Sequence, residues 1–221
     1  MKKIINTLKS DYLLIIIVLA GFIVGAVFFQ KLPNRVPIHW DSNGNVNGYG
    51  SKFTAAFLMP IVNLFTYLLF KVIPYIDPKR KNYDKFMGSY KLVEYITMIV
   101  LLAMEVFTLM YAVGFKVNIS LICGLIVSAV FICVGNAMGR FRFNYFVGIR
   151  DPWTLANEDV WKNTHRVSGP IWVLGGIVNI VFSFMGGKLA VYGFLVVIII
   201  IAVLPIIYSY INFRKLQETK N

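Results

Sequence analysis

Two acidic residues interrupt an otherwise apolar stretch and are the first candidates for chemistry. Glu94 and Glu105 both fall within the hydrophobic run Leu92–Val113. Their spacing turns an ideal α-helix by three turns plus about 20°, so the two carboxyls share one face. Ionisable groups inside a membrane are costly and often functional. The pair therefore marks a candidate site for proton or ion coupling.

A structural interpretation of the same residues stays open beside the functional one. Glu94 would then pair with Lys91 or a loop arginine, and Glu105 would hydrogen-bond a neighbouring helix. In the functional interpretation, Glu105 near the bilayer midplane is protonated or couples to an ion. Three amides within other apolar runs are weaker candidates of the same kind: Asn63, Asn136 and Asn179.

Side chains that bind metals or form covalent intermediates are scarce. The chain has two histidines, His39 and His165, and two cysteines, Cys123 and Cys133, which share one apolar run. Sequence motifs of zinc proteases, serine hydrolases and phosphate-binding loops do not occur. We expect no catalytic residues, no cofactor, no metal site and no disulfide.

Membrane-spanning helices must position these polar residues. Hydrophobic residues make up 58% of the 221-residue chain, and the 14% that are charged lie between long apolar runs. A hydrocarbon core of roughly 30 Å needs about 20 helical residues. The fold is therefore predicted to be all-α, a polytopic membrane protein with six transmembrane helices. The six runs are Tyr12–Phe29, Phe53–Phe70, Leu92–Val113, Ile119–Met138, Gly169–Met185 and Leu189–Ile211.

The distribution of basic residues predicts the orientation. One side holds every lysine and arginine except Lys31, Arg35, Lys52, Lys116 and Lys188. Cytoplasmic loops carry the excess of positive charge, so both termini are predicted to be cytoplasmic. The net charge of +12 then reflects topology and attraction to anionic lipid headgroups. We expect no direct binding to nucleic acid.

The connection 31–52 is predicted to form a compact cap on the outer side. Asn43-Gly44 and Asn47-Gly48 are turn dipeptides that would fold it back on itself. Aromatic side chains in such a loop anchor it at the lipid headgroups or contact a partner. The candidates for an outer contact are His39, Trp40 and Tyr49.

The same loop has the spacing of a calcium site without its essential residues. Asp41, Asn43 and Asn45 match the first ligand positions of a calcium-binding loop. Val46 stands where that loop needs glycine, and Lys52 stands where it needs a bidentate glutamate. We therefore reject calcium binding here.

The connection 139–168 is predicted to contain a helix on the cytoplasmic surface. Asn157 can cap this helix, and Gly169-Pro170 would end it. An apolar face at helical spacing would lie on the membrane, which makes the helix amphipathic and places it between the fourth and fifth spans. That face consists of Val160, Trp161, Thr164 and Val167.

The inner connection also carries a specific string of residues. The string is Gly135-Asn136, Asn144-Tyr145-Phe146-Val147-Gly148-Ile149-Arg150, Pro152-Trp153-Thr154-Leu155, Val160-Trp161 and Thr164-His165-Arg166. On these residues the chain resembles the SdpI family, bacterial immunity proteins against the Sdp killing-factor peptide toxin. Asp151 stands where that family usually has a small hydroxyl residue, and its carboxylate could neutralise Arg150.

The outer loop resembles the small domain that often precedes the core of that family. The matching residues are Leu32-Pro33, Pro37-Ile38-His39-Trp40, Gly44, Gly48 and Lys52. The expected domains are an N-terminal helical hairpin, 1–76, and an SdpI-like core with four transmembrane helices, 77–221.

The resemblance implies protection of a producing cell from a membrane-active secreted peptide. For the prototype it also implies signalling, in which the toxin-bound immunity protein holds a transcriptional repressor at the membrane. Expected partners are therefore membrane lipids, a secreted peptide toxin and a cytoplasmic repressor. The cytoplasmic candidates, for contact or for structural anchoring, are Asn144, Gly148, Arg150, Pro152, Trp153, Thr154, Trp161, Thr164, His165 and Arg166.

Two other functions stay open at this stage. One is a small ion-coupled transporter or channel built around Glu94, Glu105, Asn63 and Asn179, because midplane polar groups near helix breaks form such sites. The other is a membrane sensor whose basic inner loop docks a cytoplasmic regulator.

Overall fold

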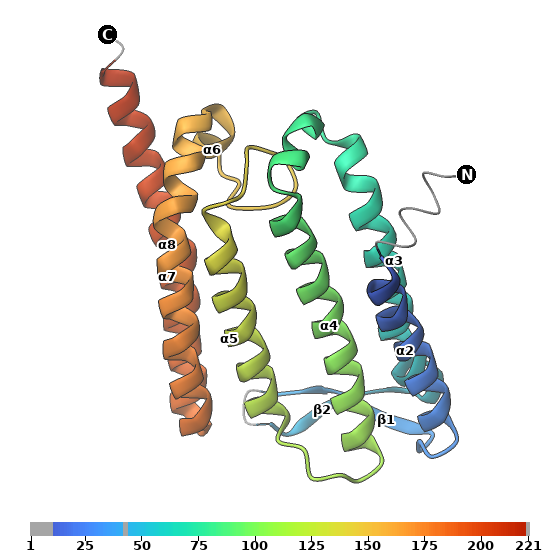
Figure 1. The fold of residues 1–221 in the computed structure, drawn as a ribbon. Helices are drawn as coiled ribbons and strands as arrows, with labels where there is room; N and C mark the ends of the chain where they lie inside the picture. Colours follow the sequence, from blue (N-terminus) through green and yellow to red (C-terminus); the bar gives the residue numbers. More distant parts are fainter. Residues whose placement is uncertain (1–10, 42–43, 220–221) are drawn as a thin grey trace, which may run out of the picture. The chain divides into compact units, whose positions relative to one another are not determined.

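The six apolar runs fold into six long helices (Figure 1). The structure, a computed structural model, describes residues 11–41 and 44–219. Within these residues, six helices are long and apolar enough to cross a membrane, which confirms the predicted fold class. They are α2 (Tyr12–Phe29), α3 (Lys52–Ile76), α4 (Met87–Ala112), α5 (Ile119–Met138), α7 (Glu158–Met185) and α8 (Gly187–Glu218).

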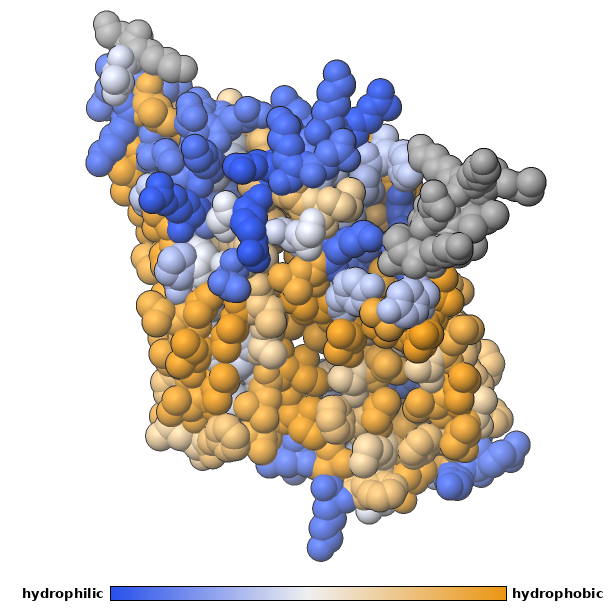
Figure 2. Space-filling model, in the orientation of Figure 1, coloured by the Kyte–Doolittle hydropathy of each residue, from blue (hydrophilic) through white to orange (hydrophobic). Residues whose placement is uncertain are grey.

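On the face seen in Figure 2, hydrophobic residues cover the middle of the helices and hydrophilic residues gather toward their ends. This distribution is stable in a lipid bilayer, because the apolar side chains face the hydrocarbon and each helix satisfies its own backbone hydrogen bonds. The lysines Lys2, Lys3, Lys9 and Lys220, which contribute to the predicted orientation, lie outside the described residues. The cytoplasmic placement of both termini stays a prediction.

The chain divides into two compact units. Unit 1 takes its described residues from Met1–Lys71 and Glu94–Ile119, and unit 2 from Val72–Val93 and Ser120–Asn221. Helices α3 and α4 each contribute to both units. The predicted domain boundary between residues 76 and 77 stays a prediction.

Unit 1 contains an antiparallel β-hairpin that the turn dipeptides alone did not predict. Its strands are β1 (Arg35–Trp40) and β2 (Val46–Ser51). Gly44, with a φ of +83°, lies in the turn as expected, but Asn47-Gly48 lies in β2. Gly48 pairs with His39, and a Cβ atom at Gly48 would lie 2.8 Å from the Cβ of His39. That glycine therefore makes room for the histidine instead of making a turn.

Buried residues at the base of the hairpin fix it to the helices of unit 1. Val36 of β1 is fully buried, and Leu32 before it is nearly so. Both belong to an apolar cluster completed by Ala55, Ala56 and Leu109. The hairpin is therefore seated on α3 and α4.

Small residues bring α5 and α7 close together in unit 2. A Cβ atom at Gly169 would lie 2.7 Å from the carbonyl oxygen of Gly135, and one at Gly176 would lie 2.8 Å from that of Ser128. Such close approach is how membrane helices gain packing energy when lipid offers no hydrophobic driving force.

The predicted surface helix is instead the first part of α7. Asn157 caps it as expected, accepting hydrogen bonds from the backbone of Asp159 and Val160. However, the helix runs through Gly169 and Pro170 without ending. Proline removes one backbone hydrogen bond, which a membrane helix packed along its length tolerates.

The expected apolar face of that segment points mostly into unit 2. Val160, Trp161 and Thr164 are buried, whereas Val167 is 37% exposed. The prediction of a separate amphipathic helix lying on the membrane is therefore wrong for these residues.

Candidate functional site

The hairpin presents two of the three outer candidates on its surface. Tyr49 is half exposed, and the guanidinium of Arg35 lies 4.7 Å from the centre of its ring. His39 is exposed, and its Nδ1 lies 2.5 Å from the amide oxygen of Asn47. Both are therefore available to a partner.

Trp40 is turned toward the helices of unit 1. Its ring packs edge-on against Tyr111 at a centroid distance of 5.2 Å. Its indole nitrogen is buried and donates to none of the described residues. Trp40 therefore anchors the hairpin, as interfacial aromatics commonly do.

The turn of the hairpin uses the acid that resembled a calcium ligand. The Asp41 carboxylate accepts a 2.9 Å hydrogen bond from the backbone of Asn45 and a second from its side chain. Asn43 lies outside the described residues. Within the described part of the chain, no group of three or more His, Cys, Asp or Glu side chains could hold a metal ion.

Glu94 pairs with a cation, but the cation is Lys71 of α3. The Lys71 ammonium lies 2.7 Å from Glu94 Oε1 and 2.9 Å from Asp11 Oδ2. Both carboxylates are at most 2% exposed. The predicted partner was Lys91 or a loop arginine, and the prediction missed Lys71, which lies on a neighbouring helix of unit 1.

Glu105 is buried in unit 1 among residues that leave space for its carboxyl. A Cβ atom at Gly21 of α2 would lie 3.0 Å from Glu105 Oε2 and 3.4 Å from Pro60. Its other oxygen, Oε1, is buried without a hydrogen-bond partner among the described residues. At this oxygen, the expected hydrogen bond to a neighbouring helix is not seen among the described residues.

The close approach of α2 to α3 depends on residues that sequence reasoning missed. Pro60 has no N–H to donate to the carbonyl of Ala56. Gly25 lies against this carbonyl, so closely that a Cβ atom there would collide with the oxygen. The available signal was the Gly21-x-x-x-Gly25 spacing within an apolar run.

The three intramembrane amides have different surroundings. Asn63 donates a 3.1 Å bond to the carbonyl of Met98, and its amide oxygen is buried without a partner in the described chain. Asn179 donates to the Ser128 hydroxyl at 2.8 Å and so joins α7 to α5. Asn136 is exposed on α5. Among the described residues, the Asn63 side chain thus bonds to a backbone carbonyl and not to Glu94 or Glu105.

Asn144 builds the turn that opens the inner motif in unit 2. Its amide nitrogen donates to the carbonyls of Arg142 and Val147, at 2.8 and 2.9 Å. Its amide oxygen accepts from the backbone of Phe146 and Val147. Every hydrogen-bonding group of this buried side chain is used, so its role is structural.

His165 and Trp161 hold the next part of the motif. His165 Nε2 accepts a 2.9 Å hydrogen bond from the backbone of Ile149, so the proton lies on Nδ1, which donates to the Trp161 carbonyl. The two rings stack at 4.2 Å, and the Trp161 indole donates to the carbonyl of Phe141.

Gly148 is required where the chain passes His165. Its φ is +123°, a conformation that other residues rarely adopt. A Cβ atom there would collide with His165 Nε2 and lie 3.1 Å from the Trp161 ring. Backbone conformation and space therefore both demand glycine.

Asp151 caps the short helix α6 (Pro152–Ala156) and does not neutralise Arg150. Its carboxylate accepts hydrogen bonds from the backbone of Trp153 and Thr154, and a 2.7 Å bond from the Ser209 hydroxyl of α8. Arg150 instead donates to the carbonyl of Tyr145. Aspartate and small hydroxyl residues are both good caps, so the departure from the family pattern preserves this function.

The remaining motif residues divide between buried and exposed positions. The Thr154 hydroxyl donates to the carbonyl of Ile149, and the ring of Trp153 lies 5.1 Å from that of Tyr210. Thr164 is buried, and its hydroxyl has no partner in the part of the chain described. The side chains of the motif string that are left at the surface are Asn136, Tyr145, Arg150, Pro152 and Arg166.

Asp77 was missed, although it organises the inner side of unit 2. It is 1% exposed and accepts hydrogen bonds from the Tyr83 hydroxyl at 2.8 Å and the Tyr145 backbone at 2.9 Å. Burial and this hydrogen bond raise the pKa of Tyr83 above its usual value. An acid placed directly after an apolar run, ahead of several basic residues, was the available signal.

Comparisons with known proteins agree with this arrangement. Residues 140–209, which include most of the inner motif, match the SdpI/YfhL protein family, and residues 16–64, which include the hairpin, match a domain of unknown function, DUF1648. The chain is 30% identical over 213 residues to the Immunity protein SdpI of Bacillus subtilis (strain 168), covering 96% of this chain and all of that protein. No solved structure matches.

A relative of this identity over nearly the full length, with the six spans in place, makes the chain a multi-pass protein of the cell membrane. It belongs to the SdpI family of immunity proteins.

Proposed function

We propose that this protein protects its cell from a secreted antimicrobial peptide by binding and without chemistry. The observation that carries the proposal is the near full-length similarity to Immunity protein SdpI. The hydrogen bonds of Asn144, His165 and Asp151 support it, because they build a fixed inner loop and leave no acid, base and nucleophile arranged together.

The hairpin β1–β2 is the proposed contact for the peptide. His39 and Tyr49 are exposed on it, beside the cation of Arg35. An aromatic ring with a neighbouring cation suits an amphipathic peptide at the membrane surface. Trp40 is assigned a positioning role, because it packs on Tyr111. This proposal requires the hairpin to face outward, as the distribution of basic residues predicts.

The protection assay uses a sensitive strain that expresses the protein and is exposed to the Sdp killing-factor peptide. We expect survival with the wild-type protein and at least about tenfold lower survival with His39→Ala/Tyr49→Ala. Each substitution removes an exposed side chain that is proposed to contact the peptide. Lys116→Ala, which removes another of the basic residues predicted to lie on the outer side, is the matched control. Equal killing with and without the wild-type protein, at verified membrane expression, would refute the proposal.

The exposed arginines of the inner motif are the proposed contact for a transcriptional repressor. Arg150 and Arg166 lie at the surface of unit 2, and arginine is favoured at protein interfaces. We expect Arg150→Ala/Arg166→Ala to abolish a peptide-dependent transcriptional response while protection persists. A response that survives both substitutions would remove this contact from the proposal and leave protection untouched.

Ion coupling is the second candidate function, and one observation favours it. Glu105 has a buried carboxyl oxygen with no hydrogen-bond partner in the described residues. Such an oxygen is available to bind a proton or a cation, and ionisable groups inside a membrane commonly mark ion pathways. Proton flux in proteoliposomes that disappears in Glu105→Gln would support it. Protection by Glu105→Gln at the wild-type level, with no flux from either protein, would exclude it.

A further inference from the structure

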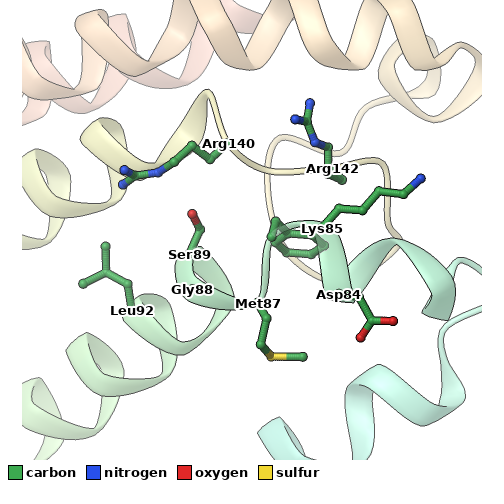
Figure 3. A pocket seen from close by; sticks show the side chains of 9 residues that line it. Asp84, Lys85, Met87, Gly88, Ser89, Leu92, Arg140 and Arg142 are labelled. Carbon is green, nitrogen blue, oxygen red and sulfur yellow. The ribbon is translucent and has the colours of Figure 1, made fainter.

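Unit 2 contains a cavity of about 620 Å³ that the inner motif does not use. It lies between the first two turns of α4 and the segment that follows α5 (Figure 3). Since α4 and α5 are both membrane-spanning helices, their adjoining ends lie at the boundary between hydrocarbon and water. The cavity is therefore at the level of lipid headgroups.

The cavity is positively charged. Lys85, Arg140 and Arg142 line it, against the carboxylate of Asp84. Three cations and one anion leave a net charge of +2, and the Asp84 carboxyl points away from Arg140 (Figure 3). Neither guanidinium forms a salt bridge or a side-chain hydrogen bond with any residue of 11–41 or 44–219. Two arginines at one cavity are thus left with their hydrogen-bond donors available.

Ser89 adds a neutral donor to the same cavity. It is 6% exposed and lines the cavity. Figure 3 shows this hydroxyl turned toward the side chain of Arg140. Ser89 also lies in the first turn of α4, where backbone N–H groups have no partner within the helix. Helix N-termini and arginines both favour phosphate.

The remaining lining is apolar. Leu92 lies one turn further along α4, beneath the extended side chain of Arg140 (Figure 3), and Phe86 precedes the helix. A soluble anion would gain nothing from these side chains. A phospholipid would place its phosphate at Arg140 and Ser89, with the positive charge of Lys85 and Arg142 further along the cavity, and its glycerol and first methylenes against the apolar wall (Figure 3).

We propose that this cavity binds the phosphate of an anionic phospholipid. A phosphodiester without an ammonium group fits best, because the cationic lining repels choline and ethanolamine. This inference is independent of peptide binding, since the hairpin belongs to unit 1 and the cavity to unit 2.

The test is native mass spectrometry of the full-length protein in detergent with added phosphatidylglycerol or phosphatidylcholine. We expect wild-type protein to retain phosphatidylglycerol at least about tenfold more tightly than phosphatidylcholine, since the phosphate gains charge-assisted hydrogen bonds without a repelled ammonium. Arg140→Gln/Arg142→Gln should remove this preference. Lys81→Gln, which removes an exposed charge outside the cavity, should keep affinity within about twofold of wild type.

A second variant closes the cavity without removing charge. A Cβ atom at Gly88 would meet no atom within 4 Å, so the leucine of Gly88→Leu grows into open space and improves helix propensity. We expect this variant to fold and to lose phosphatidylglycerol. If the double arginine variant fails to fold, Gly88→Leu still tests whether phosphatidylglycerol binds in the cavity.

Three results would overturn the proposal. Equal retention of the two lipids would show that no phosphate site of this kind exists. Equal weakening by Lys81→Gln would reduce the effect to general surface charge. Stabilisation by inorganic phosphate as large as that by phosphatidylglycerol would assign the cavity to a soluble anion.

Discussion

Lys71→Met isolates the energetic role of the charged group in unit 1. The Lys71 ammonium lies within 3 Å of the Asp11 and Glu94 carboxylates, at 2.9 and 2.7 Å. The group has one cation and two anions, so its formal charge changes from −1 to −2 when the cation is removed. Methionine keeps the length of the side chain and helix propensity, so the loss of charge is what the substitution tests.

The expected cost follows from burial. Removing one partner of a buried ion pair costs roughly 3–5 kcal/mol, because an uncompensated charge stays buried. Lys71 is 25% exposed, and water screens part of the interaction, so we expect about 3 kcal/mol. For a chain of this length that corresponds to a fall in Tm of roughly 6–12 °C.

The assay is thermal unfolding of the purified protein in detergent, followed by circular dichroism. Lys81→Met, at an exposed position, is the control and should unfold within about 1 °C of wild type, since surface substitutions cost little. In a double-mutant cycle, adding Glu94→Gln to Lys71→Met should recover part of the loss, because one buried charge disappears. Wild-type stability of Lys71→Met, or strict additivity in the cycle, would refute the reasoning.

Other predictions test the inner motif and the helix crossing. Gly148→Ala should destabilise the protein by at least about 2 kcal/mol, because of its positive φ and its contact with His165, whereas Gly139→Ala, in open space, should not. Asp151→Ser should be more stable than Asp151→Ala by about 1 kcal/mol and should melt at a higher temperature, since serine retains the helix cap. Equal melting curves for the two variants would contradict a capping role for Asp151. Gly25→Val should reduce folded yield from membranes severalfold by separating α2 from α3, and wild-type yield would show that the crossing tolerates a side chain.

Particular residues show what could be learned about the site from sequence. The string from Asn144 to Arg166 lies within the region that matches the SdpI/YfhL protein family, and the structure describes all of it. The individual roles were hidden, because Ile149 lies 16 residues from its partner His165 and Ser209 lies 58 residues from its partner Asp151. Distances of that kind along the chain are not encoded in any local spacing.

The sequence by itself determined the membrane-spanning fold. An apolar run of about 20 residues in lipid has to be helical, since each backbone group must bond within its own segment. For that reason Tyr12–Phe29 and Ile119–Met138 were predicted with the bounds that the structure has. The apolar composition of a run and its length are local properties of the sequence, and they are sufficient to predict a membrane-spanning helix.

Tertiary structure decided what the local rules could not. Gly169-Pro170 reads as a helix end, yet α7 continues because packing against Gly135 holds both sides of the proline. Glu94 pairs with Lys71, which lies 23 positions earlier in the chain, because a neighbouring helix brings this lysine within hydrogen-bond distance. The packing of the helices determines which buried polar side chains become neighbours. That packing depends on contacts throughout the unit and not on the sequence around any one residue.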